Sequence, residues 1–511
     1  MTEPLDVVIL GGGTAGWMAA AALVSSLPPG RCRLRLIESE EIGTVGVGEA
    51  TLPQMKNFNR GIGIDEAEMM RATNATFKLG IQFVDWGFKG SRYIHPFGIH
   101  GPAAEGSSFR HRWLRALRHG LKSDIQEFSL AIVAAEANRF DFPDDRKTTL
   151  KSTFDYAYHF DASLYAAYLR RLSESRGVTR TEGKVKTVER SSETGNIDAL
   201  VMESGERICG DFFIDCSGFR SLLLGNTLGI EWEDWSKWLP CDRAWAVPSE
   251  RAKDFTPYTR STAMEAGWRW RIPLQHRTGN GYVFSSSFIG EQEAADALLG
   301  ELDSAAAAEP RLLKFRAGRR AVNWEANCVA LGLASGFLEP LESTSIYLIQ
   351  MAIMHLVPLF PAKSMDPRLR YEFNRKIDLE YERIRDFLIL HYHLGSRDDA
   401  EIWRYCRSMT IPESLQRKIM LFRHSGIVEE YKDGLFNPPS WLSVFLGQGL
   451  VPENYHPAAD VQAQDQLITA LEDLRTDIRD HVEEMPGHER FVARYCEAPP
   501  VTELPKAEMR L

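Results

Sequence analysis

The chain has 511 residues, too many for a single domain of 100–200 residues, and this length predicts two or three lobes around one large core. Its composition, 44% hydrophobic and 25% charged, is that of a globular protein, and its formal charge of −10 argues against nucleic acid or an anionic membrane as the main partner. Seven scattered cysteines without a C-x-x-C pair predict reduced, packed thiols in a cytosolic protein, with no zinc site or disulfide framework. The first residues lack a basic segment, so we expect no signal peptide.

The first predicted element is a buried strand that runs into a glycine-rich turn. Residues 7–10 are apolar, and Gly11, Gly13 and Gly16 follow with the spacing G-x-G-x-x-G before an alanine-rich helix. Gly11 permits a tight turn, Gly13 lets the backbone approach a pyrophosphate, and Gly16 allows the helix to pack closely on the strand. The free N–H groups at the start of such a helix bind phosphate.

A second predicted strand, residues 33–37, ends at Glu38, about 20 residues after the last glycine, where a dinucleotide-binding βαβ unit places its ribose-binding acid. The two strands therefore predict a Rossmann-type dinucleotide site, with a purely structural glycine turn as the alternative. The next segment, residues 42–53, has three glycines close together and predicts a loop that lies against a flat ligand.

The following 100 residues include Lys78 and many aromatic rings. Residues 64–79 are predicted as a helix that carries Lys78 near its end, where the simplest interpretation is a solvated charge. Residues 81–160 are rich in aromatic residues and histidines, interrupted by glycines and prolines. This composition suits loops that shape a pocket for a planar substrate, and an ordinary aromatic core is the alternative.

A helix is then predicted at residues 161–175, followed by strands at 184–189, 199–202 and 211–215. The last of these strands runs into a D-x-x-G turn that begins at Asp215, a second place where backbone meets a nucleotide.

Antiparallel strands are predicted at residues 264–290. Trp268 and Trp270 are two residues apart and share one strand face, either as packing or as the wall of a ligand site. A further short strand is predicted at residues 328–332, and a helix from residue 341, with Glu342 in its first turn as caps prefer.

The remaining predictions are helical. The alanine run at 305–308 predicts a surface helix, and the apolar run at 346–360 predicts a buried helix too short to span a bilayer. From about residue 365 the chain becomes helical and charged, and its last element, near residues 465–481, has amphipathic spacing.

Three of these motifs resemble flavin-dependent halogenases of the tryptophan-halogenase type. They are the glycine turn at 11–16, the W-x-W-x-I-P element from Trp268 to Pro273, and the segment from Leu338 to Thr344. The W-x-W-x-I-P element separates these halogenases from related flavin monooxygenases. Shorter matches lie at residues 46–51, 77–80, 95–98 and 215–220, and the resemblance extends to about residue 455.

The resemblance implies an α/β fold with two parts. Residues 1–364 are expected to form an FAD-binding and catalytic lobe of the two-dinucleotide-domain (Rossmann) type with a mixed sheet. This lobe includes a substrate-shaping insertion at about 81–160 and antiparallel strands at about 240–290. Residues 365–511 are expected to form a mainly helical lobe that covers the substrate site.

The resemblance also implies the cofactors. A separate flavin reductase supplies FADH2, which reacts with O2 to a C4a-hydroperoxide, and halide, chloride or bromide, attacks it to give hypohalous acid. The positions that match FAD-binding residues are Gly11, Gly13, Thr14, Ala15, Gly16, Glu38, Ser39, Val47, Glu49, Ala50, Val185, Leu333 and Ile346. Thr344 and Ser345 match the halide site, although the family usually has glycine at the position of Ser345. No metal is expected.

The catalytic residues implied by the resemblance are Lys78 and Glu342. Hypohalous acid passes through a tunnel to Lys78, which hydrogen-bonds it or forms a haloamine, and an electron-rich aromatic carbon is halogenated. Glu342 stabilises and deprotonates the cationic ring intermediate, with helix capping as its alternative role. The matching substrate-binding residues are His95, Phe97 and Phe436, and the matching active-site wall is Trp268 and Trp270.

One region departs from the family's pattern. Enzymes that act on free tryptophan clamp the amino acid with paired tyrosines and a Phe-Trp pair, which residues 424–441 lack. We therefore expect a small aromatic substrate of indole type other than free tryptophan, either a larger or a simpler indole. The alternatives are a flavin-dependent aromatic monooxygenase and a non-catalytic FAD protein. The oligomeric state stays open, a homodimer included.

Overall fold

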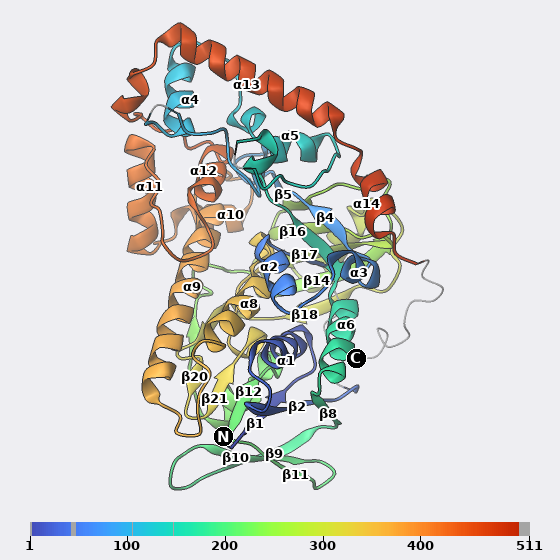
Figure 1. Cartoon of the computed structure of the whole chain (residues 1–511). Helices are drawn as coiled ribbons and strands as arrows, with labels where there is room; N and C mark the ends of the chain where they lie inside the picture. Colours follow the sequence, from blue (N-terminus) through green and yellow to red (C-terminus); the bar gives the residue numbers. More distant parts are fainter. Residues whose placement is uncertain (1–2, 42–47, 105, 147, 500–511) are drawn as a thin grey trace.

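The computed structural model describes residues 3–41, 48–104, 106–146 and 148–499. Figure 1 shows a six-stranded sheet at one end of the molecule, helices of the C-terminal part at the opposite end, and a seven-stranded sheet between them. This mixed α/β architecture with a helical C-terminal part confirms the expected fold class. In the described part of the chain, no helix has both the length and the apolar composition of a bilayer span.

The six-stranded sheet is built around β1 (Leu5–Leu10), which pairs in parallel with β2 (Cys32–Glu38) and β12 (Phe212–Asp215). Alternate side chains of β1 enter two separate hydrophobic clusters, so both faces of the strand are buried. A parallel strand buried on both faces is largely apolar, and β1 is apolar except for Asp6, which forms an ion pair with Arg33. The other strands of the sheet are β8 (Thr179–Glu182), β21 (Cys328–Ala330) and the antiparallel edge strand β20 (Trp324–Glu325).

The helix α1 (Thr14–Ser26) follows the glycine turn and packs against α6 (Ala162–Ser175) and α8 (Thr344–Leu356). Its run of buried alanines lets these helices approach closely. The other helices of the N-terminal part are α2 (Gln54–Gly61), α3 (Glu66–Ala72), α4 (Phe109–Arg118), α5 (Leu130–Glu136) and α7 (Glu291–Gly300).

The seven-stranded sheet has the order β18-β14-β17-β16-β15-β5-β6, antiparallel except where β15 meets β5. Trp268 and Trp270 lie on one face of β16, with ring centroids 6.1 Å apart, which confirms their predicted common face. The strands are β5 (Gly80–Val84), β6 (Arg92–Pro96), β14 (Arg243–Glu250), β15 (Thr259–Ala263), β16 (Gly267–Pro273), β17 (Arg277–Phe284) and β18 (Arg311–Lys314).

Three further sheets have three strands each. One holds β3 (Gly48–Ala50), β7 (Ala157–Asp161) and β4 (Thr76–Lys78); another holds β9 (Val185–Arg190), β10 (Ile197–Met202) and β11 (Arg207–Cys209); the last holds β13 (Trp232–Asp234), β19 (Gly318–Arg320) and β22 (Gly336–Phe337).

The prediction of one helix over residues 64–79 is wrong in its second half. Helix α3 ends at Ala72, Asn74 takes a left-handed conformation with φ 52°, and the chain continues as strand β4. Phe77 draws this segment into an aromatic cluster, where its ring stacks on Phe140 at a centroid distance of 4.1 Å. Tertiary packing thus overrides the helical pattern and makes Lys78 a strand residue.

Two smaller expectations also fail. Residues 305–308 are exposed but not helical, because Ala307 N–H donates to Pro248 and Ala305 accepts from Glu250, which aligns the run beside β14.

All seven cysteines are free, but Cys209 is exposed rather than packed, since it ends an edge strand of its sheet.

The C-terminal part is helical, as expected, and its first helix α9 (Pro367–His393) has 27 residues. A single hydrophobic cluster extends from β1 to the last helix, so the two predicted lobes share one core. The boundary at residue 364 stays a prediction. The later helices are α10 (Glu401–Ser408), α11 (Glu413–Ser425), α12 (Pro438–Gly447), α13 (Gln464–Glu484) and α14 (His488–Cys496).

Helix α14 braces the strand that carries Lys78. His488 at its start is buried; its Nε2 accepts from Phe77 N–H at 3.2 Å, and its Nδ1 lies 3.1 Å from the Phe255 carbonyl oxygen. This arrangement requires a neutral imidazole with its proton on Nδ1. Burial accordingly lowers the pKa of His488 to about 4, and Arg251 lowers it further.

We predict that His488 makes the protein less stable as the pH falls from 6.5 to 4. In this window the unfolded chain binds a proton at this histidine and the folded chain does not, so the free energy of unfolding falls by at most about 1.4 kcal/mol per pH unit. His488→Gln removes this contribution and flattens the pH dependence of unfolding measured by thermal denaturation. The control His119→Gln changes an exposed histidine and should leave the slope unchanged. An unchanged slope in His488→Gln would contradict the assignment.

Candidate functional site

The glycine turn has the geometry of a phosphate cradle. Gly11 has φ +114°, and a Cβ there would lie 2.2 Å from the Cys216 carbonyl oxygen. A Cβ on Gly16 would lie 1.8 Å from the Gly11 carbonyl oxygen, whereas a Cβ on Gly13 would have no heavy atom within 4 Å. Gly11 and Gly16 are therefore needed for the turn itself, and the space beside Gly13 is open for a phosphate at the start of α1.

Glu38 ends β2 beside this turn. Its carboxylate accepts from Trp17 Nε1 at 3.2 Å and forms ion pairs with Arg170, at 3.4 Å, and Arg180. A Cβ on Gly12 would collide with the Glu38 carboxylate, so this acid lies directly over the turn. The pattern placed Glu38 correctly but gave no signal for its arginine partners.

The other residues expected to bind FAD lie on several elements. Leu333 belongs to a short turn whose Gly332 packs on Ala15 in the first turn of α1. Ile346 is buried on α8, Glu49 and Ala50 form β3, Ser39 follows β2, Thr14 starts α1, and Val185 begins β9. Val47 lies outside the described residues. The open cradle, the acid beside it and the free N-terminus of α1 fit a dinucleotide such as FAD.

Lys78 is buried, which rules out a solvated charge. Its Nζ donates to the Thr51 carbonyl oxygen at 3.0 Å and to Ser343 Oγ at 2.7 Å, and lies 5.1 Å from the centroid of the Phe97 ring. Burial lowers the pKa of Lys78 to about 7, although Glu342 and Glu49 oppose the shift. A lysine with this pKa is available both as a hydrogen-bond donor and as a free amine near neutral pH.

Glu49 lies next to this lysine in the segment expected to contact FAD. Burial raises the pKa of its carboxyl to about 7, and the charge of Lys78 opposes the shift. The predicted cofactor segment and the predicted catalytic lysine are therefore electrostatically coupled.

The expected helix start at residue 341 is corrected by the structure. Pro340–Glu342 forms a short 3-10 turn, Ser343 is left-handed with φ 59°, and α8 begins at Thr344. A left-handed serine costs about 1–3 kcal/mol, and here its Oγ accepts from Lys78. Glu342 thus lies outside the helix whose first turn it was expected to cap.

The Glu342 carboxylate is fully buried and faces two histidines. His95 Nδ1 lies 2.9 Å from Oε2, and His391 Nε2 lies 2.8 Å from Oε1. Burial raises the pKa of Glu342, but the two histidines outweigh it and lower this pKa to about 2. Its carboxylate is accordingly ionised across the neutral range, as a proton acceptor requires.

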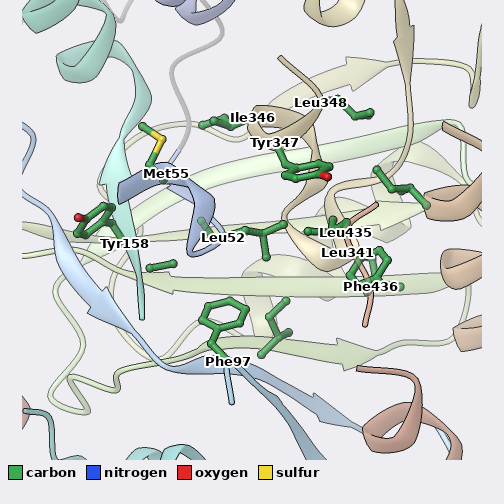
Figure 2. Close-up of a cluster of buried hydrophobic side chains, with 14 of the residues drawn as sticks. Leu52, Met55, Phe97, Tyr158, Leu341, Ile346, Tyr347, Leu348, Leu435 and Phe436 are labelled. Carbon is green, nitrogen blue, oxygen red and sulfur yellow. The ribbon is translucent and has the colours of Figure 1, made fainter. Parts of the chain in front are cut away.

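Apolar side chains surround the lysine and the acid. Figure 2 shows Phe97, Leu52, Leu341 and Phe436 converging from separate segments of the chain. Phe436 stacks on Phe387 at a centroid distance of 3.8 Å, and its ring lies 6.2 Å from that of His95. The structure therefore brings together the catalytic candidates and all three substrate-binding candidates, namely Lys78, Glu342, His95, Phe97 and Phe436.

Trp268 is hydrogen-bonded to the residue that precedes the 3-10 turn Pro340–Glu342. Its Nε1 donates to Glu339 Oε2 at 2.9 Å, and Tyr392 OH donates to the same oxygen. Glu339 is buried, and burial raises its pKa to about 7, opposed by these two hydrogen bonds. Trp270 covers Gly281, where a Cβ would lie 2.0 Å from its ring.

The two halide candidates are at the start of α8. Thr344 is buried, and its Oγ1 has no hydrogen-bond partner among the described residues, while Ser345 is partly buried. A buried hydroxyl beside unpaired helix amides fits a small anion. Groups of three or more metal-ligating side chains are absent from the described segments.

Sequence reasoning missed four residues of this site: Thr51, Glu339, Ser343 and His391. Glu339 and Ser343 lie inside the motif that carried the resemblance, yet only Glu342 and Thr344 of that motif received a role. Thr51 acts through its backbone carbonyl, and His391 is in an ordinary helical stretch, so neither carries a local signal.

Comparisons with known proteins show the family of this chain. The sequence profile of the tryptophan halogenase family matches residues 6–464. Tryptophan 6-halogenase SttH of Streptomyces toxytricini is 36% identical over 500 residues, which cover 92% of this chain and 95% of that protein.

Two solved structures are similar along the whole chain. BrvH, a flavin-dependent halogenase from Brevundimonas sp. BAL3, has a TM-score of 0.93 and 44% identity, covering 97% of this chain and 99% of that one. Xcc4156, a flavin-dependent halogenase from Xanthomonas campestris, has a TM-score of 0.94 and 48% identity with the same coverage, 97% and 99%. The chain therefore belongs to the tryptophan halogenase family, and it is a flavin-dependent halogenase, an enzyme that uses reduced FAD, O2 and halide.

Proposed function

We propose that the enzyme halogenates an electron-rich aromatic substrate of indole type and that Lys78 delivers the halogen. One observation carries the proposal: the Lys78 amine is buried beside the ionised Glu342 within a cluster of apolar and aromatic side chains. A donor, a base and flat apolar surfaces are the three elements that aromatic halogenation by hypohalous acid requires.

The cofactor is assigned to the cradle. Gly11, Gly13 and Gly16 admit its pyrophosphate, and Glu38 binds the ribose hydroxyls. Bound reduced FAD supplies, with O2, the oxidising equivalent that converts halide to hypohalous acid. A separate flavin reductase in the cytosol provides FADH2. Thr344 and Ser345 hold the halide at the N-terminus of α8, where the helix dipole favours an anion.

Lys78 and Glu342 act on the aromatic substrate. Lys78 binds hypohalous acid by donating an N–H to its oxygen, or takes the halogen onto its free amine. Glu342 stabilises the cationic ring by its charge and accepts the proton that the ring loses. Because Ser343 holds the lysine and follows the acid directly in the chain, the two groups keep a fixed separation.

The surroundings favour a neutral planar substrate. The rings of Phe97 and Phe436 lie 6.5 and 6.2 Å from the ring of His95, between centroids, and offer apolar surface there. Residues 424–441 lack the tyrosine pair and the Phe-Trp pair of the amino-acid clamp. Several relatives are named tryptophan halogenases, and the indole ring is the part of tryptophan that such surfaces bind. We infer an indole without a free amino-acid group.

We predict that the purified protein, given FAD, a flavin reductase, NADH, bromide and indole, produces bromoindole detectable by mass spectrometry. Free tryptophan should react more slowly, because the clamp for its charged groups is missing. A product heavier by one oxygen atom would indicate a monooxygenase. A clear preference for tryptophan would contradict the substrate assignment.

Lys78→Met should abolish product while hypobromous acid still forms, because the variant retains the cradle and loses only the amine. Hypobromous acid is measured with a trapping reagent in the absence of indole. Lys78→Arg should also fail, since guanidinium is always protonated and differently shaped. Lys89→Met, which changes a lysine with a 71% exposed side chain, is the control. Substantial product from Lys78→Met would remove Lys78 from the mechanism.

Glu342→Gln should slow bromination by roughly 10²–10³-fold, the scale of one lost transition-state electrostatic contact. Glutamine has nearly the same shape, so the comparison separates charge from packing. Product is measured with free hypobromous acid scavenged, so that bromination in solution does not hide the loss. A variant that melts at a lower temperature but works at the normal rate would assign Glu342 a structural role only.

Gly13→Val should abolish FAD binding in a folded protein. The backbone of Gly13 has φ −74°, which valine tolerates, and the new side chain would fill the open space beside the turn. Binding is measured by fluorescence quenching of FAD and folding by circular dichroism. Gly290→Val, at another helix N-cap glycine with φ −73° whose Cβ would also meet no neighbour within 4 Å, controls for the loss of a glycine. Normal FAD affinity in Gly13→Val would refute the cradle.

A further inference from the structure

Phe436 lies in the segment 427–441, which packs against helices α9 and α11. Figure 1 shows α11 and α12 beside α9. The Phe436 ring stacks on Phe387 of α9 at a centroid distance of 3.8 Å. Trp441 Nε1 donates to the Phe436 carbonyl oxygen at 3.2 Å, and the Trp441 ring lies 5.0 Å from that of Phe387. The position of Phe436 therefore depends on Trp441 as well as on α9.

A buried lysine of α11 contacts two rings of this segment. The side chain of Lys418 is 8% exposed, and its Nζ lies 5.0 Å from the centroid of the Trp441 ring and 5.4 Å from that of the Tyr431 ring. A cation within about 6 Å of an aromatic face is attracted to it, and more strongly where water is excluded. Lys418 therefore holds two points of the segment at once.

Helix α9 supplies the countercharge of this lysine. Lys418 Nζ lies 3.4 Å from Asp386 Oδ2, and Ser414 Oγ donates to the same oxygen at 2.6 Å. Arg385 donates to Asp386 Oδ1 at 2.8 Å. Burial lowers the pKa of Lys418, and the charge of Asp386 opposes this shift. Because Asp386 directly precedes Phe387, α9 holds the lysine with one residue and the stacked ring of the segment with the next.

The space around Lys418 is too small for a substrate ring. Lys418 lines a cavity of about 10 Å³ together with Ile427, Val428, Tyr431 and Trp441, among others. A cavity of this volume holds at most one water molecule. Lys418 therefore acts on a substrate through the rings that it contacts, and it is not a catalytic residue.

The polar side chains in the first part of the segment also face the two helices. Glu429 accepts from Tyr431 OH at 3.1 Å and forms an ion pair with Arg417 of α11 at 2.5 Å. The guanidinium of Arg383 on α9 lies 4.3 Å from the centroid of the Tyr431 ring. Glu429 and Tyr431 are thus engaged by the protein itself, which leaves Phe436 as the aromatic side chain that the segment contributes to the site.

We propose that Lys418 is a positioning residue whose ammonium, fixed by Asp386, holds Tyr431 and Trp441 and thereby keeps Phe436 in place as a wall for the substrate. The inference rests on the proposed function, in which Phe436 contacts an indole-type substrate. A wall that is ordered before the substrate arrives does not have to be ordered by binding, so Lys418 improves affinity. The reaction at Lys78 does not depend on it.

The first test compares the kinetics of Lys418→Met with those of the parent enzyme. Methionine keeps most of the apolar stem and removes the charge. The KM for indole should rise roughly 3–30-fold, the scale of one buried cation–π contact, while kcat stays near the parent value. Hypobromous acid formation, trapped in the absence of indole, should be normal. Lys418→Arg keeps a cation and should restore most of the affinity.

Lys432→Met is the matched control, since it changes an exposed lysine of the same segment. Its KM for indole should equal that of the parent enzyme. A KM as high in Lys432→Met as in Lys418→Met would overturn the proposal, because any lost charge near the segment would then have the same effect. An equal loss of hypobromous acid and of product in Lys418→Met would also overturn it.

The second test measures the segment directly and needs no activity. Amide hydrogen exchange in peptides from 427–441 should be faster in Lys418→Met, whereas peptides that contain Lys78 should exchange as in the parent. Lys418→Arg should exchange normally. If Lys418→Met does not fold, Tyr431→Leu removes one of the two rings at a partly buried position. It should raise the exchange rate and the KM in the same direction, and unchanged values of both would overturn the proposal.

A double-mutant cycle tests whether the lysine and the ring act together. Lys418→Met should raise the KM by a smaller factor in the Tyr431→Leu background than in the parent, because one of its two ring contacts is already missing. Equal factors in both backgrounds would overturn the contact between Lys418 and Tyr431 as the source of the effect.

The two readouts separate this inference from the proposed function. If exchange becomes faster in Lys418→Met while the KM for indole is unchanged, the hold on the segment is supported and the role of Phe436 in the proposed function is refuted. If the KM rises while exchange is unchanged, the positioning role of Lys418 is refuted. If neither changes, Lys418 has no role in the site.

Discussion

The burial of an amine and a carboxylate side by side is the constraint on which the rest of the structure depends. Lys78 and Glu342 have almost no contact with water, so each must be balanced by protein groups. The balance comes from the Thr51 carbonyl, the Ser343 hydroxyl and two histidines. Every one of these groups lies on a different segment, and the fold must bring those segments to one point.

Three structural features meet this requirement. The pairing of β4 with β7 fixes the position of Lys78 in its sheet. The left-handed Ser343 turns the chain between the 3-10 turn and α8. The end of the long helix α9 contacts Glu339 and Glu342, the two acids of this turn. Trp268 on β16, in the seven-stranded sheet, holds the same turn by its hydrogen bond to Glu339. Trp268 of the W-x-W-x-I-P element thereby stabilises the geometry of the reacting groups through an uncharged hydrogen-bond donor.

Local patterns could be predicted from the sequence, whereas long-range electrostatics could not. The glycine turn, the acid after β2 and the paired tryptophans depend on backbone geometry within a few residues, and the structure places them as expected. The surroundings of Lys78 depend on Thr51 and Ser343, which are 27 and 265 residues away. The helix predicted for residues 64–79 failed for the same reason, because aromatic packing around Phe77 outweighs local helical preference. His391 lies in a sequence that reads as an ordinary helix, and only its distance to Glu342 reveals it.

The brace between His488 and the strand of Lys78 has a consequence for the order in which the enzyme matures. A ribosome synthesises Phe77 long before His488, so the strand emerges with one side of its aromatic cluster uncovered. Contacts of such large sequence separation form late in folding. The strands and helices that support the glycine turn end by Leu356, so a nascent chain should complete its flavin cradle before His488 is synthesised and braces the strand of Lys78.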